Sequence, residues 1–209
     1  MSLRVKICGM TNLDDALAAV EAGADALGFM FCELSPRNVT LMTAANILQR
    51  LPPFVARVGV FVNPAESLVK SAIETCGVDT LQFHGEETPD FCRKFGLKVI
   101  KAFRMQSRET LSVIRNYETD AWLLDSFVAG TRGGTGATFN WELAVEARKM
   151  GRPVILAGGL TPENVANAVR QVAPYAVDVS SGVESSPGKK DHAKVRRFIA
   201  AAVAADKGA

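Results

Sequence analysis

The 209-residue chain has few of the residues that build metal centres or disulfide frameworks. It contains only two histidines, His84 and His192, and four cysteines without a Cys-x-x-Cys spacing among them. Two imidazoles so far apart do not predict a zinc cluster. Scattered cysteines in a chain without an export signal are expected to be free thiols in a reducing cytoplasm, so we predict a cytoplasmic protein without a metal.

An excess of one charge is missing as well. The 24 Lys and Arg residues nearly balance the 22 Asp and Glu residues, and the net charge of +2 argues against nucleic acid or an anionic membrane as a partner. No apolar stretch reaches the length of a membrane-spanning helix. The 48% of hydrophobic residues is ample for a sizeable core, and no linker or low-complexity run divides it. We expect one domain over residues 1–209.

What the sequence does contain is a repeated unit. Apolar runs rich in β-formers alternate along the whole chain with segments of helical spacing. The runs are 4–9, 26–31, 56–61, 80–85, 98–103, 121–126, 153–158 and 176–181. A strand–helix unit repeated eight times predicts a parallel sheet, and the absence of an extra strand favours a closed (β/α)8 TIM barrel over an open doubly wound sheet.

The boundaries of the helices carry two kinds of signal. Capping residues followed by a proline or an acid predict helix starts at Thr11, Asn63-Pro64, Thr88-Pro89 and Thr161-Pro162. Glycines that follow helical runs predict left-handed helix ends at Gly23, Gly77, Gly96 and Gly151.

In such a barrel the carboxyl ends of the strands share one face, which carries the active site. The predicted strand ends bring a thiol (Cys8), an imidazole (His84) and a carboxylate (Asp125) to this face, with Arg37 in a nearby loop. Each has a structural alternative: Cys8 as a small buried hydrophobe, Asp125 as a helix cap or loop ion pair, and His84 as a partner of backbone groups. We expect Cys32, Cys76 and Cys92 to be structural.

Two glycine-containing stretches follow the last two predicted strands. They are "AGGLTPENV" (157–165) and "DVSSGVE" (178–184). Glycines allow backbone N–H groups to converge on an anion, and the loops after strands seven and eight are the usual phosphate site of TIM barrels. Tight turns without a ligand are the alternative. A third stretch, "GTRGGTGATF" (130–139), suits either a lid over a ligand or a plain flexible loop.

Taken together, these motifs resemble the phosphoribosylanthranilate isomerase family over essentially the whole chain. The matching segments are "KICGMTNLDDALAAVEAGADALGFMF", "SPR", "VGVFVN", "LQFHGEE", "LLD", "GGTGATFNW", "AGGLTPENV" and "VDVSSGVESSPGKKD". The resemblance implies an aldose–ketose isomerase of tryptophan biosynthesis. Its reaction would be the Amadori rearrangement of N-(5-phosphoribosyl)anthranilate to 1-(2-carboxyphenylamino)-1-deoxyribulose 5-phosphate, by general acid–base catalysis without cofactor or metal.

The resemblance also implies roles for residues. The family's base maps onto Cys8, its acid onto Asp125, and the arginine that holds the anthranilate carboxylate onto Arg37. The remaining substrate contacts map onto His84, Gly158, Gly159, Asp178, Ser181 and Gly182, with Asp178 near the sugar hydroxyls and the glycines and Ser181 at the phosphate.

Departures from the family pattern and rival functions remain. Cys32, Glu33 and Asn38 are atypical in the loop that carries Arg37. A histidine-pathway isomerase of the same fold would predict an aspartate in place of Cys8, and a non-catalytic phosphate-ligand binding protein would not need Cys8 and Asp125. The phosphorylated small-molecule substrate is the expected partner, and the oligomeric state stays open between a monomer and a homodimer.

Overall fold

The computed structural model describes residues 2–126 and 141–208. Its parallel strands are β1 (Arg4–Cys8), β2 (Ala26–Phe31), β3 (Ala56–Phe61), β4 (Thr80–Phe83), β5 (Lys98–Met105), β6 (Ala121–Ser126), β7 (Val154–Leu156) and β8 (Ala176–Val179). The α-helices are α1 (Leu13–Glu21), α2 (Leu41–Leu48), α3 (Glu66–Ser71), α4 (Pro89–Cys92), α5 (Thr110–Ile114), α6 (Trp141–Arg148), α7 (Val165–Val172) and α8 (His192–Lys207). Short turns of other helix types cover Ala72–Cys76, Arg93–Phe95 and Ser181–Val183, and a small hairpin joins β9 (Glu184–Ser186) to β10 (Lys189–Lys190).

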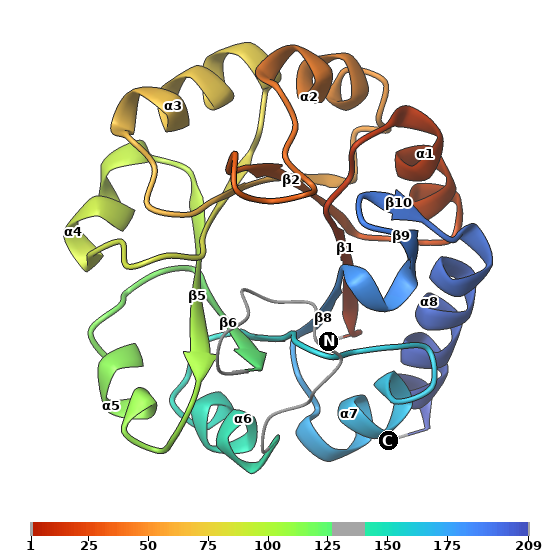
Figure 1. The fold of residues 1–209 in the computed structure, drawn as a ribbon. Coiled ribbons are helices and arrows are strands. Elements are labelled where there is room, and N and C mark those ends of the chain that lie inside the picture. The colour runs from red at the N-terminus through yellow and green to blue at the C-terminus, as the bar shows by residue number, and fades with distance from the viewer. Residues whose placement is uncertain (1, 127–140, 209) are drawn as a thin grey trace.

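The eight strands pair in sequence order and form a closed barrel, because β8 also pairs with β1. Figure 1 looks along this barrel and shows the helices as a ring around it. The predicted (β/α)8 TIM barrel is confirmed, and the strands lie within the predicted apolar runs or differ from them by a few residues at an end. The β9–β10 hairpin was not predicted from the sequence.

Side chains that alternate along the strands form two separate apolar clusters. The smaller cluster fills the barrel and includes Val58, Val60, Ala102, Leu123 and Ile155. The larger one lies between strands and helices, where Phe29 and Phe61 have no exposed surface. Burying such a side chain contributes about 1.5–3 kcal/mol each, so the outer cluster holds the helices on the barrel. Inward-facing residues at the strand ends are left to line the mouth.

The predicted helix ends are confirmed, whereas the predicted starts are only partly right. Gly23, Gly77, Gly96 and Gly151 all have positive φ. Thr88 caps α4 by accepting a hydrogen bond from the amide of Phe91, as predicted.

Three predicted starts are wrong in detail because another polar residue performs the capping or because tertiary contacts use the residue elsewhere. Asn12, and not Thr11, caps α1. The helix α7 begins after Asn164, three residues beyond Thr161. Asn63 has a φ of 48°, and its side chain accepts a hydrogen bond from the amide of Glu86 in the next loop.

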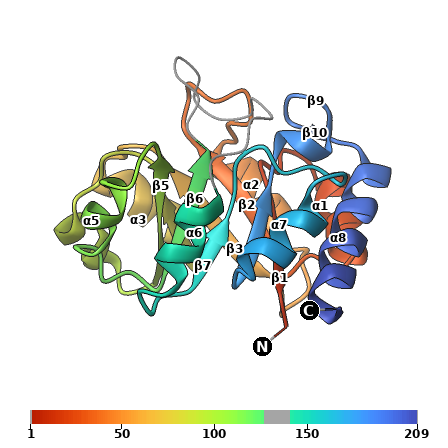
Figure 2. The same ribbon diagram turned by 90° about the horizontal axis from the view of Figure 1, so that it is seen from below.

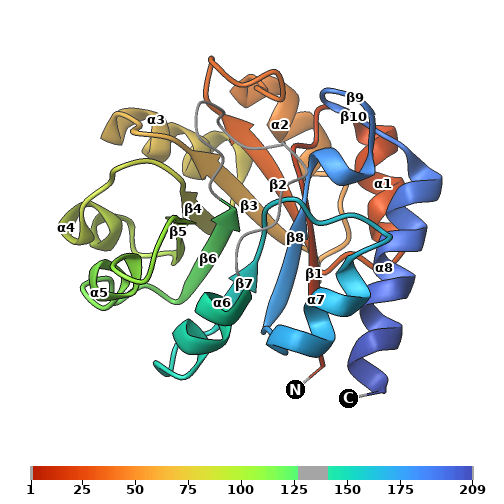
Figure 3. The ribbon, with the colours of Figure 1, turned by 60° about the horizontal axis from the view of Figure 1, so that its bottom comes forward.

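The two ends of the barrel have different roles. Figures 2 and 3 show both chain ends at one end of the barrel and the β9–β10 hairpin at the other. A hydrogen bond of 2.9 Å from the Leu3 amide to the Asp206 carboxylate joins the N-terminal and C-terminal segments. None of the helices that the structure describes has the length and apolar composition that a membrane crossing requires. The opposite end, where the strands finish, is free to carry a site.

Candidate active site

A cavity opens at the carboxyl ends of the strands, where the sequence predicted a site. Every predicted site residue lines it: Cys8, Arg37, His84, Asp125, Gly158, Gly159, Asp178, Ser181 and Gly182. Gln82, Arg104 and Ser180, which were not among the predicted site residues, line it as well. Residues 130–139, expected to form either a lid or a plain loop, lie outside the described part of the chain.

Cys8 is the last residue of β1 and is only 6% exposed. Burial raises the pKa of its thiol, and the nearby Lys6 ammonium opposes that rise. Lys6 also faces the interior of the barrel, where its Nζ lies 2.8 Å from Oδ1 of Asp178 on β8. The thiol therefore lies beside a buried ion pair, of which Asp178 was among the predicted site residues and Lys6 was not.

Asp125 lies on the far side of the same cavity, near the end of β6. Its Oδ2 is 3.2 Å from Nε2 of His84, which follows β4 directly. The other ring nitrogen of His84, Nδ1, is 3.1 Å from Nε2 of Gln82. The two contacts hold the imidazole of His84 between Gln82 and Asp125.

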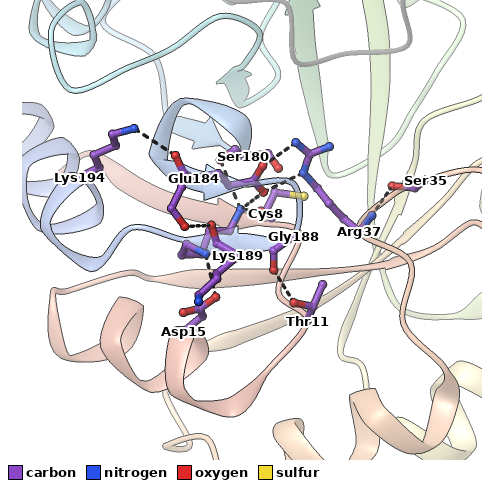
Figure 4. A network of polar contacts seen from close by, with 12 residues as sticks. Cys8, Thr11, Asp15, Ser35, Arg37, Ser180, Glu184, Gly188, Lys189 and Lys194 are labelled. Carbon is purple, nitrogen blue, oxygen red and sulfur yellow. Dashed lines mark hydrogen bonds and ion pairs between the residues drawn. The ribbon is translucent and has the colours of Figure 1, made fainter.

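Arg37 lies in the loop after β2 and is held by a residue that the sequence analysis did not select. Its Nε and Nη2 donate to the two carboxylate oxygens of Glu184 at 2.8 and 2.6 Å. Figure 4 shows this pair beside Cys8. The Glu184 contact raises the pKa of Arg37. The guanidinium fork expected to grip a substrate carboxylate is therefore occupied, and Nη1 is the nitrogen outside that contact.

Lys190 on β10 contacts the same carboxylate and forms a charged cluster with Arg37 and Glu184. Its Nζ lies 2.8 Å from Oε1 of Glu184 and 2.6 Å from the carbonyl oxygen of Cys8. Burial lowers the pKa of Lys190 despite that contact. Burial works against ionisation of Glu184, but hydrogen bonds from Arg37 and charge on Lys190 outweigh it and lower the pKa of Glu184. Two cations share one carboxylate, so the cluster keeps a positive charge at the mouth.

The loops after β7 and β8 pack directly on each other. Gly158 and Gly159 have φ values of 81° and 65°, a conformation that favours glycine. A Cβ on Gly182 would lie 2.0 Å from the carbonyl oxygen of Leu160, so that position also requires glycine. The side chain of Asn164 donates to the Gly159 carbonyl and orders the turn before α7. This arrangement brings the backbone of both loops to the lining of the cavity.

Ser180 and Arg104 are two further polar residues of the cavity. The Ser180 hydroxyl is buried and has no hydrogen-bond partner within the described residues. Arg104 lies next to Asp125 in the pairing of β5 with β6. The inward register of β5 and β8 was the signal that could have identified them, because Ala102 and Asp178, two residues earlier, also face inward.

One of the three cysteines expected to be structural lies in the site. Cys32 was expected to be structural, but it lines the cavity and is partly exposed. Cys76 and Cys92 are buried on helical segments, as expected. Within residues 2–126 and 141–208, no group of three or more His, Cys, Asp or Glu side chains has the arrangement of a metal site.

Known proteins resemble the chain over nearly its whole length. The family model described as N-(5'phosphoribosyl)anthranilate (PRA) isomerase matches residues 5–201. A protein of Trichlorobacter lovleyi named N-(5'-phosphoribosyl)anthranilate isomerase is 55% identical over 197 residues, which are 94% of this chain and 96% of that protein.

Solved structures agree with this match. A crystal structure of phosphoribosyl anthranilate isomerase in complex with reduced 1-(o-carboxyphenylamino)-1-deoxyribulose 5-phosphate matches with a TM-score of 0.88 and 43% identity, covering 99% of this chain and 100% of that one. A Thermotoga maritima structure, described as "mutually generated monomers" of a dimeric isomerase of this name, matches with a TM-score of 0.87 and 42% identity at the same coverage.

Proposed function

Because the chain belongs to the N-(5'-phosphoribosyl)anthranilate isomerase family, we propose that Cys8 is the general base and Asp125 the general acid of its reaction. The enzyme converts N-(5-phosphoribosyl)anthranilate into 1-(2-carboxyphenylamino)-1-deoxyribulose 5-phosphate in tryptophan biosynthesis. One observation supports the proposal above all: a thiol and a carboxylic side chain face the same cavity from different strands.

The first step opens the furanose ring and needs a proton on the ring oxygen. A carboxylic acid at the end of β6 would deliver it, which leaves a carboxylate at Asp125. His84 lies 3.2 Å away, and its Nε2–H would stabilise that carboxylate by a hydrogen bond. The ring-opened product is a Schiff base, which acidifies the proton on C2 of the sugar.

The second step removes the proton from C2 and gives the enolamine, which tautomerises to the ketose product. The thiolate of Cys8 would accept this proton, because Cys8 lines the cavity from β1, three strands round the barrel from Asp125 on β6. Burial raises the pKa of the thiol, so the thiolate needs nearby positive charge to form.

Two further parts of the cavity would bind the substrate: the glycine loops after β7 and β8, and the charged cluster around Arg37. We infer that the phosphate binds the loops that contain Gly158, Gly159, Ser181 and Gly182, where backbone amides converge. The anthranilate carboxylate would bind near Arg37. Because Glu184 occupies the fork of that guanidinium, the contact would be made through Nη1 and through the positive charge of the whole cluster. Asp178 would approach the sugar hydroxyls while it remains paired with Lys6.

Turnover of N-(5-phosphoribosyl)anthranilate, followed by anthranilate fluorescence, tests the assignment of the acid and the base. We expect Cys8→Ser and Asp125→Asn to bind inorganic phosphate like the parent and to lose most of their kcat. Variants that keep near-parental kcat would refute the assignment, and a parent that binds phosphate without turnover would favour the non-catalytic binding protein. Turnover that persists after dialysis against EDTA would support a reaction without a metal.

Three broader expectations remain predictions. Light scattering of the purified protein distinguishes a monomer from a homodimer, and limited proteolysis tests whether residues 1–209 behave as one domain. A cytoplasmic location agrees with an enzyme of amino-acid biosynthesis and is tested by cell fractionation.

A further inference from the structure

A buried lysine lies in the barrel one layer below the proposed base. Lys6 and Cys8 are two residues apart on β1, so both side chains face the interior. Lys6 is 3% exposed and Cys8 is 6% exposed. A lysine in such a place is costly unless its charge is compensated, and Asp178 compensates it at 2.8 Å. Because burying these two charges is unfavourable, we expect the ion pair to have a role in the site.

The neighbouring strand shows how close the lysine lies to the thiol. A Cβ on Gly28 of β2 would lie 2.7 Å from Cys8 Sγ and 3.1 Å from Lys6 Nζ. Both polar atoms therefore lie around the same point on the inner surface of the barrel. The space above Gly28 is empty of side chain, and this lets the ammonium and the thiol approach each other.

Four charged side chains face the thiol from the elements packed against it. They are Lys6 on β1, Asp178 on β8, Lys190 on β10 and Arg37 in the loop after β2. Arg37 is engaged by Glu184, and Lys190 is directed to the Cys8 carbonyl and to Glu184. Burial is the main cause that raises the pKa of Cys8, and among the charges Lys6 opposes it most.

We propose that Lys6 is a positioning residue that stabilises the Cys8 thiolate, with Asp178 holding the ammonium in place. When Cys8 gives up its proton, the negative charge forms beside a cation that is already buried and oriented. When the thiolate accepts the C2 proton from the substrate, the negative charge on the sulfur is neutralised. Lys6 is then paired with the Asp178 carboxylate alone. The inference rests on the proposed role of Cys8 as the base.

A purely structural role for the ion pair is the alternative. In that case Lys6 and Asp178 would only tie β1 to β8, and their loss would lower stability without changing the ionisation of the thiol. The two roles differ in the pH dependence of thiol reactivity, because a thiolate is the species that reacts with an alkylating agent.

The test measures the rate of Cys8 alkylation by iodoacetamide against pH, with mass spectrometry of the modified residue. All variants carry Cys32→Ser, because Cys32 lines the same cavity. We expect Lys6→Met to raise the pH midpoint of alkylation by at least about one unit, since an opposite charge at this range lowers a pKa by about 1–3 units. The rate at neutral pH should fall about tenfold or more as a result.

Two further measurements make the result decisive. The double variant Lys6→Met with Asp178→Asn leaves no unpaired buried charge, so it carries the same test if Lys6→Met is unstable. Its midpoint should lie above that of the parent and below that of Lys6→Met, because the Asp178 carboxylate also raises the thiol pKa. In concentrated urea all midpoints should coincide near the ordinary value for a free cysteine.

The matched control is a second buried ion pair, Lys101 with Glu87, whose ammonium and carboxylate are 3.2 Å apart. Lys101→Met with Glu87→Gln should lower stability and leave the alkylation midpoint of Cys8 unchanged. An unchanged midpoint in both Lys6 variants would overturn the proposal. The proposal for Lys6 and the proposal that Cys8 is the base can fail separately. If the pH midpoint of alkylation shifts but the acid limb of the kcat/KM profile does not, Lys6 tunes the thiol and Cys8 is not the base.

Discussion

Two walls of one cavity differ in how deeply their ionisable groups are buried and in what stabilises the charge on them. The thiol wall consists of Lys6, Cys8 and Asp178 with the neighbouring Glu184 and Lys190. On it the Lys6 and Asp178 side chains are 4% and 9% exposed, and Glu184 and Lys190 are 4% and 0% exposed. Charge on this wall is compensated by buried ion pairs that were formed when the protein folded.

The aspartate wall consists of Gln82, His84 and Asp125. Here the side chains of His84 and Asp125 are 21% and 14% exposed and are joined by a single contact of 3.2 Å. Water reaches this wall more easily, and no buried cation is needed. The comparison suggests that a thiolate, which forms poorly in a buried place, requires preorganised charge, whereas a carboxylic acid at a wetter position requires only a hydrogen-bonding partner.

The largest loss of kcat is expected when the thiol of Cys8, the reactive group of the thiol wall, is replaced. Cys8→Ser should lower kcat by about 10⁴-fold, at the upper end for loss of a general base, because a buried hydroxyl hardly ionises and water cannot replace it. Steady-state turnover measures the loss. Cys92→Ser, a substitution of another buried thiol, should leave kcat unchanged, and an active Cys8→Ser variant would return Cys8 to the role of a small buried hydrophobe.

A smaller loss is expected on the aspartate wall. Asp125→Asn should lower kcat by about 10²- to 10³-fold, because the amide cannot deliver a proton while water partly can at this more exposed position. The control is Asp120→Asn, just before the same strand, where the carboxylate accepts a hydrogen bond from the Val99 amide. That control should affect stability and spare kcat. If Asp125→Asn cost as much as Cys8→Ser, the proposed difference between the walls would be wrong.

The third prediction concerns substrate binding by Arg37, which lies at the edge of the thiol wall. Arg37→Ala should cost about 1.5–3 kcal/mol in kcat/KM, the usual value of a hydrogen bond to a charged group. Most of the loss should appear in KM, because the anthranilate carboxylate is remote from the reacting carbons. Glu184 keeps Lys190 as a partner in this variant, so the cluster should survive.

Arg57→Ala is the matched control, since that guanidinium bonds Asp79 at the other end of the barrel. Inorganic phosphate should bind Arg37→Ala as it binds the parent. A change in phosphate affinity and thermal stability together with KM would show instead that Arg37 only braces its loop.

The smallest effect concerns stability against pH. The pKa of Glu184 is lowered from its ordinary value of 4.5, so its contribution to the free energy of unfolding is complete above that value and is lost as the pH falls through the lower, folded-state pKa. The stability difference between the parent and Glu184→Gln should therefore be largest at neutral pH and shrink in acid. Urea unfolding at several pH values measures it, with exposed Glu21→Gln as background. A difference independent of pH would contradict the ionic account of the thiol wall.

Local sequence signals predicted the framework well. The strand β2 has the bounds of its predicted run, and Gly77 has the left-handed conformation expected at a helix end. Both depend on neighbours in the chain, through apolar alternation and backbone freedom. The cap at Asn63 failed because its amide side chain is used by a loop more than twenty residues away.

The candidate site shows the same division. Cys8, Asp125 and the two glycine loops could be placed from the strand ends and from a family resemblance that spans the chain. Lys6 and Glu184 could not, because their partners lie 172 and 147 residues away in sequence. Only closure of β8 onto β1 brings those partners together.

The sequence by itself determined the order of the strands and helices, the closed barrel and the face on which chemistry is gathered. These features follow from periodicity and from turn residues, which act over a few positions of the chain. The tertiary structure alone decided which charges meet: Lys6 with Asp178 beside the thiol, Arg37 with Glu184, and His84 with Asp125. The reason is physical, because electrostatic interaction depends on distance and burial, and neither is set until the barrel closes.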